Sequence, residues 1–349
     1  MKVNVPSPWL HRFSVLTAFC TLFLICVGGI VTSKGVGMAV PDWPNTYGYN
    51  MFLFPFSKWV GGIFYEHTHR LVASGVGLMT TVLAAWIWLS EKRRWLRVLG
   101  IVAFFAVILQ GVLGGLRVVL IKDELGIFHG TLAHLFFCLL VLISLFTSRW
   151  WTSGKVFGSL ETLLNLRRRI VIALCLIFGQ LVLGATMRHQ HAGLAIADFP
   201  LAYGQWYPGT AAEDVARYNN SRLESVALNP ITAFQIHLQM AHRFGAVLTA
   251  VAVVLCWRMA RSNLSEVIII QRFAIILVGL VLAQFCLGAL TVWSGKSADV
   301  ATAHVAVGAT TLAVGSLFLG VVSRLCWARV HETESLPEPK TASLLACSA

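Results

Sequence analysis

Eight apolar segments of the sequence are long enough to cross a lipid bilayer as helices, and they limit the possible folds more than any other feature. A helix needs about 20 predominantly apolar residues to span the hydrocarbon core. Only 12% of the 349 residues are charged and 57% are hydrophobic, whereas a soluble domain has about 25% charged residues. We therefore exclude a water-soluble domain and a disordered chain, and predict an all-α integral membrane protein. The predicted spans are residues 13–33, 66–90, 98–116, 126–148, 170–187, 235–257, 273–292 and 302–323.

Basic residues cluster in alternate connections between these spans, and the formal net charge is +12. Cytoplasmic loops carry such an excess of Lys and Arg, so we place both termini in the cytoplasm and expect no nucleic-acid partner. The first apolar run exceeds the ~7–15 residues of a signal peptide and lacks a small-residue cleavage pattern, which predicts a retained helix. The two largest clusters are Lys92, Arg93, Arg94 and Arg97, and Arg149, Lys155, Arg167, Arg168 and Arg169.

The chain contains an internal repeat. Residues 28–48 align with residues 184–204 at a constant offset of 156 residues, and later matches occur at offsets of 173, 174 and 175. This ordered series predicts two pseudo-symmetric four-helix units, residues 1–150 and 165–330, related by an axis along the membrane normal. We expect residues 331–349 to be a disordered tail. The later matches are His69-Arg70 with His242-Arg243, Gln110 with Gln284, Leu113-Gly114 with Leu287-Gly288, and His129 with His304.

Four histidines that the repeat matches lie near the outer ends of predicted spans two, four, six and eight. A single histidine in a membrane helix usually makes a helix–helix hydrogen bond. Two symmetric pairs at one depth instead predict two imidazoles facing each other across the core of each unit. Zinc needs further ligands, whereas haem iron accepts two axial imidazoles alone. We therefore predict that haem iron is bound by His69, His129, His242 and His304.

The other histidines of the membrane region are less informative. His134 fits packing or an indirect role better than ligation, the role of His237 is undecided, and His67 points away from the predicted ligand face. His189 and His191 either line an entrance or are simply exposed.

Glu66 distinguishes the first unit from the second. It shares a helix face with His69 and Arg70 at spacings of i, i+3 and i+4, whereas the repeat places Gln239 at the equivalent position. A buried carboxyl group can give or accept protons, and the alternative is a favourable place at the amino end of a helix. We infer that the first unit performs chemistry involving protons and that the second holds a cofactor.

Two further charged pairs recur in the repeat. Arg70 and Arg243 each follow a predicted ligand, and they either bind a haem propionate or extend toward the membrane interface. Asp42 and Asp198 lie in external segments, where turn roles suffice to explain them.

These motifs resemble the haem A synthases of bacteria and mitochondria, over about residues 13–323. The resemblance implies an eight-helix membrane oxidoreductase that converts the C8 methyl group of haem O to a formyl group by successive hydroxylations, giving haem A for cytochrome oxidase. It also implies a haem b cofactor on the second histidine pair, a substrate haem on the first pair, and Glu66 in the reaction. The matching motifs are Glu66-His67-Thr68-His69-Arg70, Phe128-His129-Gly130, Met240-Ala241-His242-Arg243, Ala303-His304 and the loop run 35–44.

The resemblance further implies a multi-pass protein of the inner or cytoplasmic membrane, in contact with membrane lipid. Its partners would be haem O from haem O synthase, a redox partner, and a haem A acceptor such as a terminal oxidase or its assembly factors. Some members of the family carry a cysteine pair in the external loops. This chain has no cysteine there, which argues against a thiol-based step.

Two rival functions come from other classes. A dihaem b-type membrane electron carrier without haem modification explains the four histidines but leaves Glu66 opposite Gln239 unexplained. A transporter predicts broken helices and polar groups at the membrane midplane, whereas these polar groups lie near the outer end.

Overall fold

The computed structural model describes residues 7–152, 157–221 and 230–334. Eight helices within these ranges are long and apolar enough to cross a membrane, which confirms the prediction of an all-α membrane protein with eight spans. The helices are α1 (Pro8–Ser33), α2 (Gly61–Ser90), α3 (Arg94–Val119), α4 (Glu124–Phe146), α6 (Leu160–His189), α8 (Ala233–Asn263), α9 (Ile268–Trp293) and α10 (Ala298–Glu334).

Most of these helices extend beyond the apolar segments that predict them. The side chain of Ser159 accepts a hydrogen bond from the backbone of Thr162 at the start of α6, and Thr232 with Gln235 forms a capping box at the start of α8. The added turns carry polar residues, so their hydropathy does not mark them as helix. Residues 331–334 belong to α10 and not to a disordered tail, and the rest of the predicted tail lies outside the described residues.

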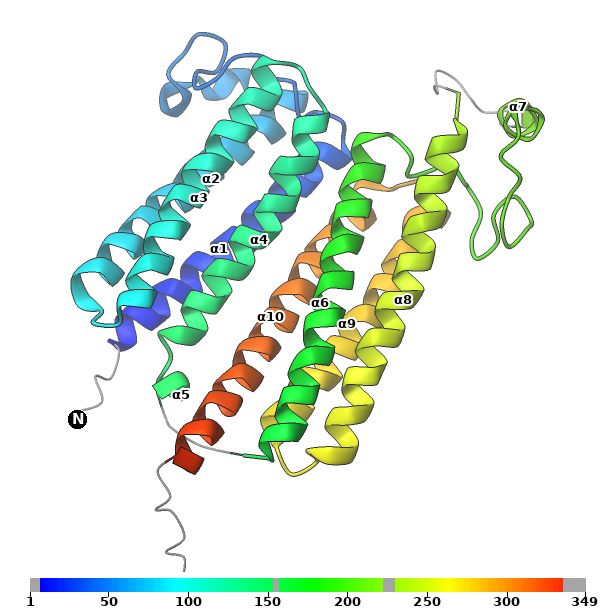
Figure 1. Ribbon diagram of the computed structural model, residues 1–349. Coiled ribbons are helices and arrows are strands. Elements are labelled where there is room, and N and C mark those ends of the chain that lie inside the picture. Colours follow the sequence, from blue (N-terminus) through cyan, green and yellow to red (C-terminus); the bar gives the residue numbers. More distant parts are fainter. Residues whose placement is uncertain (1–6, 153–156, 222–229, 335–349) are drawn as a thin grey trace, which may run out of the picture.

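The long helices lie side by side in two groups, α1 to α4 and α6, α8, α9 and α10 (Figure 1). In the first group α2 and α4 each pack against α1 and α3, and in the second α6 and α9 each pack against α8 and α10. The groups meet along a seam where α1 contacts α10 and α4 contacts both α6 and α10. Helix α10 is the most buried of these helices. In its apolar 18-residue segment 50% of the residues are buried, compared with 17% in α3.

Large apolar side chains fill the contacts between the helices. Phe318 of α10 is fully buried, and its ring stacks on Phe273 of α9 with the ring centroids 5.8 Å apart. Ile87 of α2 and Leu140 of α4 are also fully buried. Because lipid tails are as apolar as these side chains, close van der Waals packing holds such helices together.

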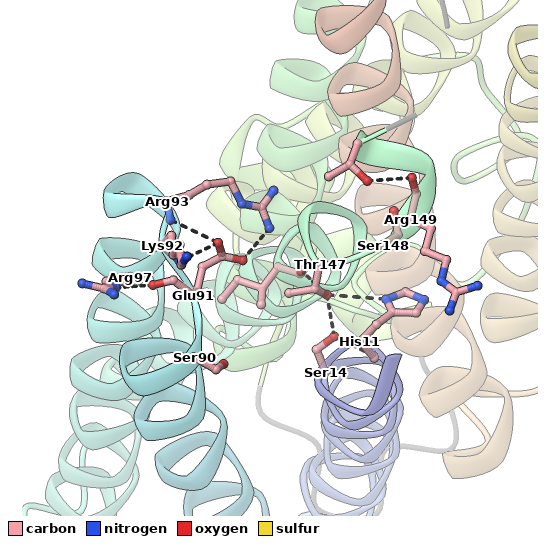
Figure 2. A network of polar contacts seen from close by, with 12 residues as sticks. His11, Ser14, Ser90, Glu91, Lys92, Arg93, Arg97, Thr147, Ser148 and Arg149 are labelled. Carbon is pink, nitrogen blue, oxygen red and sulfur yellow. Dashed lines mark hydrogen bonds and ion pairs between the residues drawn. The ribbon is translucent and has the colours of Figure 1, made fainter. Parts of the chain in front are cut away.

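Polar contacts link the helices at the end of the molecule where α1 begins (Figure 2). Thr147, which follows α4, lies 3.1 Å from Ser14 and 3.5 Å from His11 of α1, measured between side-chain polar atoms. In the turn between α2 and α3, the Glu91 carboxylate accepts hydrogen bonds from the backbone nitrogens of Lys92 and Arg93 and pairs with the Arg93 guanidinium at 2.6 Å. These contacts fix the ends of four helices.

The opposite end carries the long connection 34–60 and the described parts, residues 190–221 and 230–232, of the connection between α6 and α8. The first contains the short helices η1 (Met51–Leu53) and η2 (Phe56–Lys58), and the second contains α7 (Ala212–Ser221), which was not predicted. Tyr218 of α7 is buried, and its ring stacks on Tyr203 at 3.7 Å between the ring centroids. A further short helix, α5 (Arg149–Thr152), follows α4.

Candidate functional site

The four predicted haem ligands lie toward the end with the long connections. None is more than nine residues after the first residue of its helix, which is about 14 Å along a helix axis. His69 and His242 lie slightly further from the start of their helices than predicted, because α2 and α8 begin before their apolar segments. The helices thus place all four imidazoles in one layer of the molecule.

The second pair of histidines faces across its helix group. The ring centroids of His242 on α8 and His304 on α10 are 6.4 Å apart, and the ring planes are inclined by 76°. The side-chain amides of Gln180 and Gln284 donate to the backbone carbonyls of His242 and His304, at 2.6 and 2.9 Å. These two anchors fix the helix turns that carry the rings.

The first pair is also close, since His69 of α2 lies within electrostatic range of His129 of α4. The amide of Gln110 on α3 lies 3.1 Å from Nδ1 of His129 and 3.2 Å from its backbone oxygen. Gln110 and Gln284 are matched by the repeat, and both contact the histidine of the following long helix. A partner at the second ring nitrogen commonly orients a metal-binding histidine.

Each of the four rings lies against a glycine of a neighbouring helix. A Cβ atom added to the glycine would lie between 2.9 and 3.5 Å from Cε1 of the histidine. Glycine at these positions therefore leaves the room that the imidazole occupies. The pairs are Gly28 with His69, Gly114 with His129, Gly184 with His242, and Gly288 with His304.

This arrangement fits haem iron better than a bare metal ion. Nδ1 of His69, His242 and His304 is buried and has no hydrogen-bond partner, so the rings are not held by ordinary polar contacts. With each ring nitrogen about 2 Å from a shared metal, two facing imidazoles have their centres about 6 Å apart, close to the observed 6.4 Å. Among the described residues no group of three or more potential metal ligands occurs, and haem iron needs only two axial protein ligands.

Glu66 binds the loop that follows α1. One carboxylate oxygen accepts from the backbone nitrogen of Val40 at 2.9 Å, and the other pairs with Arg70 at 2.8 Å. In the second group Gln239 accepts from the backbone nitrogen of Ile196 at 2.7 Å, and Ile196 matches Val40 at the offset of 156 residues. Both side chains therefore hold the same point of their loops, and only Glu66 adds a buried negative charge.

The two arginines that follow the histidines also bind these loops. The Arg70 guanidinium donates to the backbone oxygens of Val40, Asp42 and Asn45 as well as to Glu66, so every N–H of its two terminal nitrogens is used. Arg243 donates in the same way to the backbone oxygen of Asp198 at 2.6 Å. Their predicted contact with a haem propionate stays a prediction.

The turn roles predicted for Asp42 and Asp198 are confirmed. The Asp42 carboxylate accepts from the backbone nitrogens of Tyr47 and Gly48, each at 2.8 Å, and Asp198 binds two backbone nitrogens of its own turn in the same way. Burial raises the pKa of Asp42, but these hydrogen bonds outweigh that effect and hold the pKa below its usual value. The two loops thus share this turn.

Comparison with known proteins places this site in a family. The model of the COX15-CtaA family, described as cytochrome oxidase assembly protein, matches residues 54–315. The chain belongs to this family. A heme A synthase of Shouchella clausii is 26% identical over 266 residues, covering 75% of this chain and 80% of that protein. A heme A synthase of Shewanella oneidensis is 24% identical over 318 residues, covering 85% and 90%.

The remaining histidines of this COX15-CtaA protein have ordinary partners. His67 is buried between Thr46 and the Trp59 ring, His134 contacts the backbone oxygen of Gly130 at 2.6 Å, and Nδ1 of His237 lies 2.8 Å from the Tyr207 hydroxyl. The burial of His67 and His134 agrees with a packing role, whereas His237 is exposed and its contact with Tyr207 does not decide its role.

His189 and His191 differ from each other. Both lie 3.9 Å from Asp123 at the start of α4, but the His189 side chain is 9% exposed and that of His191 is 73% exposed. His189 packs against Gly126 of α4 and so belongs to the seam between the two helix groups, whereas His191 is exposed.

Two partly buried arginines near the histidines were missed by sequence reasoning. Arg117 lies two residues before the end of α3 and Arg188 one residue before the end of α6, and each has a buried Nε without a hydrogen-bond partner. Neither is matched by the repeat, and both looked like ordinary cations at helix ends. The only sequence signal was their spacing from Gly114 and Gly184, of three and four residues.

Proposed function

We propose that this chain is a haem A synthase, an oxidoreductase that converts the C8 methyl group of haem O to a formyl group through the alcohol and the hydrated aldehyde. Its membership of the COX15-CtaA family and its similarity to proteins named heme A synthase support this function. The observation that carries the proposal is the layer of four glycine-packed histidines, in which one half alone adds a buried carboxylate.

In this proposal the chain is two pseudo-symmetric units, residues 1–150 and 165–330, with both termini in the cytoplasm. The recurrence of the glycine–histidine contacts and of the loop anchors at matched positions supports the duplication. The excess of basic residues at the opposite end supports the orientation. The protein then lies in the cytoplasmic or inner membrane, with its haem sites near the outer surface.

His242 and His304 hold a haem b cofactor in the proposed enzyme. Bound there, haem b supplies one-electron redox chemistry. The two imidazoles would hold its iron, while Gln180 and Gln284 keep the helix turns that carry them in place. Arg243 contributes by holding the loop that covers this site.

His69 and His129 bind the substrate haem in the first unit. Glu66 accepts a proton as the methyl carbon is oxidised, and the ion pair with Arg70 holds its carboxylate in place. The loop bound by these two side chains covers the site and limits the access of water to it. Haem O arrives from its synthase, electrons leave to a redox partner, and haem A passes to a terminal oxidase or an assembly factor.

The deciding experiment is expression of the chain in a host that makes haem O but no haem A, followed by analysis of the extracted haems. Appearance of haem A supports the synthase. Bound haem b together with unchanged haem O supports instead the dihaem electron carrier. Absence of any haem from the purified protein, with an unchanged spectrum after histidine substitution, contradicts both functions.

A further inference from the structure

Three cations meet at the loop end of the seam between the two helix groups. Arg188 of α6 is within electrostatic range of Arg117 of α3 and of Lys296, in the connection from α9 to α10. Arg117 pairs with Asp123 at 3.1 Å, and the Asp123 side chain is 44% exposed. Within the described part of the chain, neither Arg188 nor Lys296 has a carboxylate partner. Burial and the Arg188 charge lower the pKa of Lys296, as expected for a cation without a counter-charge.

These cations keep hydrogen-bond donors that the protein does not use. An arginine has five N–H donors. The Arg188 guanidinium donates through one terminal nitrogen to the backbone oxygen of Gly29 and to Ser33, and its Nε is buried without a partner. Nε of Arg117 is equally buried and unpartnered. Because a buried charge is costly unless it is paired and hydrogen-bonded, the free donors indicate an anion.

The spacing along the helices directs both arginines toward the haem sites. Arg117 follows Gly114 by three residues, and Arg188 follows Gly184 by four. Residues three or four apart share a helix face, so each arginine lies one turn beyond a glycine on which a ligand histidine packs. The Arg117 charge acts on His69 and His129, and the Arg188 charge acts on His304.

We propose that Arg117, Arg188 and Lys296 form a carboxylate site for the haem propionates, in which Arg188 and Lys296 serve the haem of the second unit and Arg117 serves that of the first. This inference rests on the haem binding of the proposed function. Both terminal nitrogens of Arg70 are already used, so only its Nε is left for the propionate contact predicted for it, and the seam supplies further donors. Arginine suits such a site because it binds carboxylates through two parallel hydrogen bonds.

The test compares haem b with its dimethyl ester, which lacks the carboxylates. The full-length chain is purified in detergent from haem-starved cells, and each compound is titrated while the Soret band is recorded. We expect the wild type to bind the free acid at least about tenfold more tightly, the effect of one charge-assisted hydrogen bond. Arg188→Gln should remove most of this preference and Arg188→Lys should retain part of it. Arg258→Gln, which removes an exposed cation of α8, should leave the preference unchanged.

Equal binding of the two compounds by the wild type overturns the inference without depending on the folding of any variant. An unchanged preference in Arg188→Gln overturns it as well. The result is independent of catalysis. If the preference holds but no haem A forms in the expression experiment, the propionate site stands and the synthase function fails. If haem A forms without the preference, only the propionate site fails.

Discussion

At the scale of single residues, the spacing between a glycine and a histidine decides whether an imidazole fits between two helices. A Cβ at Gly28 would lie 2.9 Å from Cε1 of His69, which is too close without a shift, whereas at Gly288 the corresponding distance from His304 is an ordinary 3.5 Å. The first-unit site is therefore the less tolerant of the two.

We expect Gly28→Ala to weaken haem binding by the first unit. The new methyl group displaces the His69 ring, and overpacking of this kind costs about 1–3 kcal/mol. The haem content of the purified protein and its absorption spectrum measure the effect. Gly75→Ala is the matched control, since nothing lies within 4 Å of a Cβ at that position of α2. Equal haem contents in the two variants would contradict the assigned role of Gly28.

Glu66→Gln should retain bound haem and abolish haem A formation. Gln239 already accepts a hydrogen bond from the backbone of Ile196, so a glutamine at position 66 preserves the bond to Val40 and with it the loop. What it removes is the negative charge that accepts a proton. Analysis of the extracted haems measures the product, and the absorption spectrum checks that haem is still bound. Full activity in this variant would remove the proposed role of the carboxylate.

At the scale of helices and turns, Glu91 joins α2 to α3. Burial raises the pKa of this carboxyl group, but the hydrogen bonds and charge of Arg93 outweigh the effect and hold the pKa below its usual value. A carboxylate with a lowered folded-state pKa stabilises the protein above its unfolded-state pKa, and this contribution disappears as the pH falls through the folded-state value.

Glu91→Gln should destabilise the protein by about 1 kcal/mol at neutral pH, because it removes the ion pair and weakens the bonds to the turn. The difference from the wild type should begin to shrink below the unfolded-state pKa of about 4.3 and vanish once the pH is below the lowered folded-state pKa. Thermal unfolding in detergent across this range measures both effects. Glu124→Gln, at an exposed position of α4, is the control. A difference that persists at low pH would show that the Glu91 charge is not the cause.

The sequence predicts the helices of this protein better than their contacts. Twenty apolar residues suffice to identify a span, so the apolar segments predicted all eight long apolar helices of the described residues. The helix α7 was not predicted because most of its ten residues are polar and the burial of Tyr218 holds it in place. Arg117 and Arg188 were not predicted as site residues because they interact across the seam. Neither periodicity nor an internal repeat contains information on contacts between the two halves.

At the scale of the whole molecule, the seam joins the two halves through polar contacts as well as packing. Ser33 of α1 lies 3.2 Å from Thr302 of α10, side-chain oxygen to side-chain oxygen, and Arg188 of α6 donates to Gly29 of α1. These contacts occur at the same end as the histidine layer. The orientation of the protein therefore decides which aqueous compartment lies nearest to the haem sites and to the cations of the seam.

We predict that this end faces away from the cytoplasm. A cysteine introduced at the exposed Ser57, in the connection between α1 and α2, should react with a membrane-impermeant maleimide added to intact cells. A cysteine at the exposed Ser265, between α8 and α9, should react only after the membrane is opened. The positive-inside rule gives this direction, because the cation clusters lie at the end opposite the histidines. The unmodified chain, whose described cysteines all lie in helices, supplies the background. Labelling of Ser265→Cys but not Ser57→Cys in intact cells would invert the topology and move the proposed haem chemistry to the cytoplasmic side.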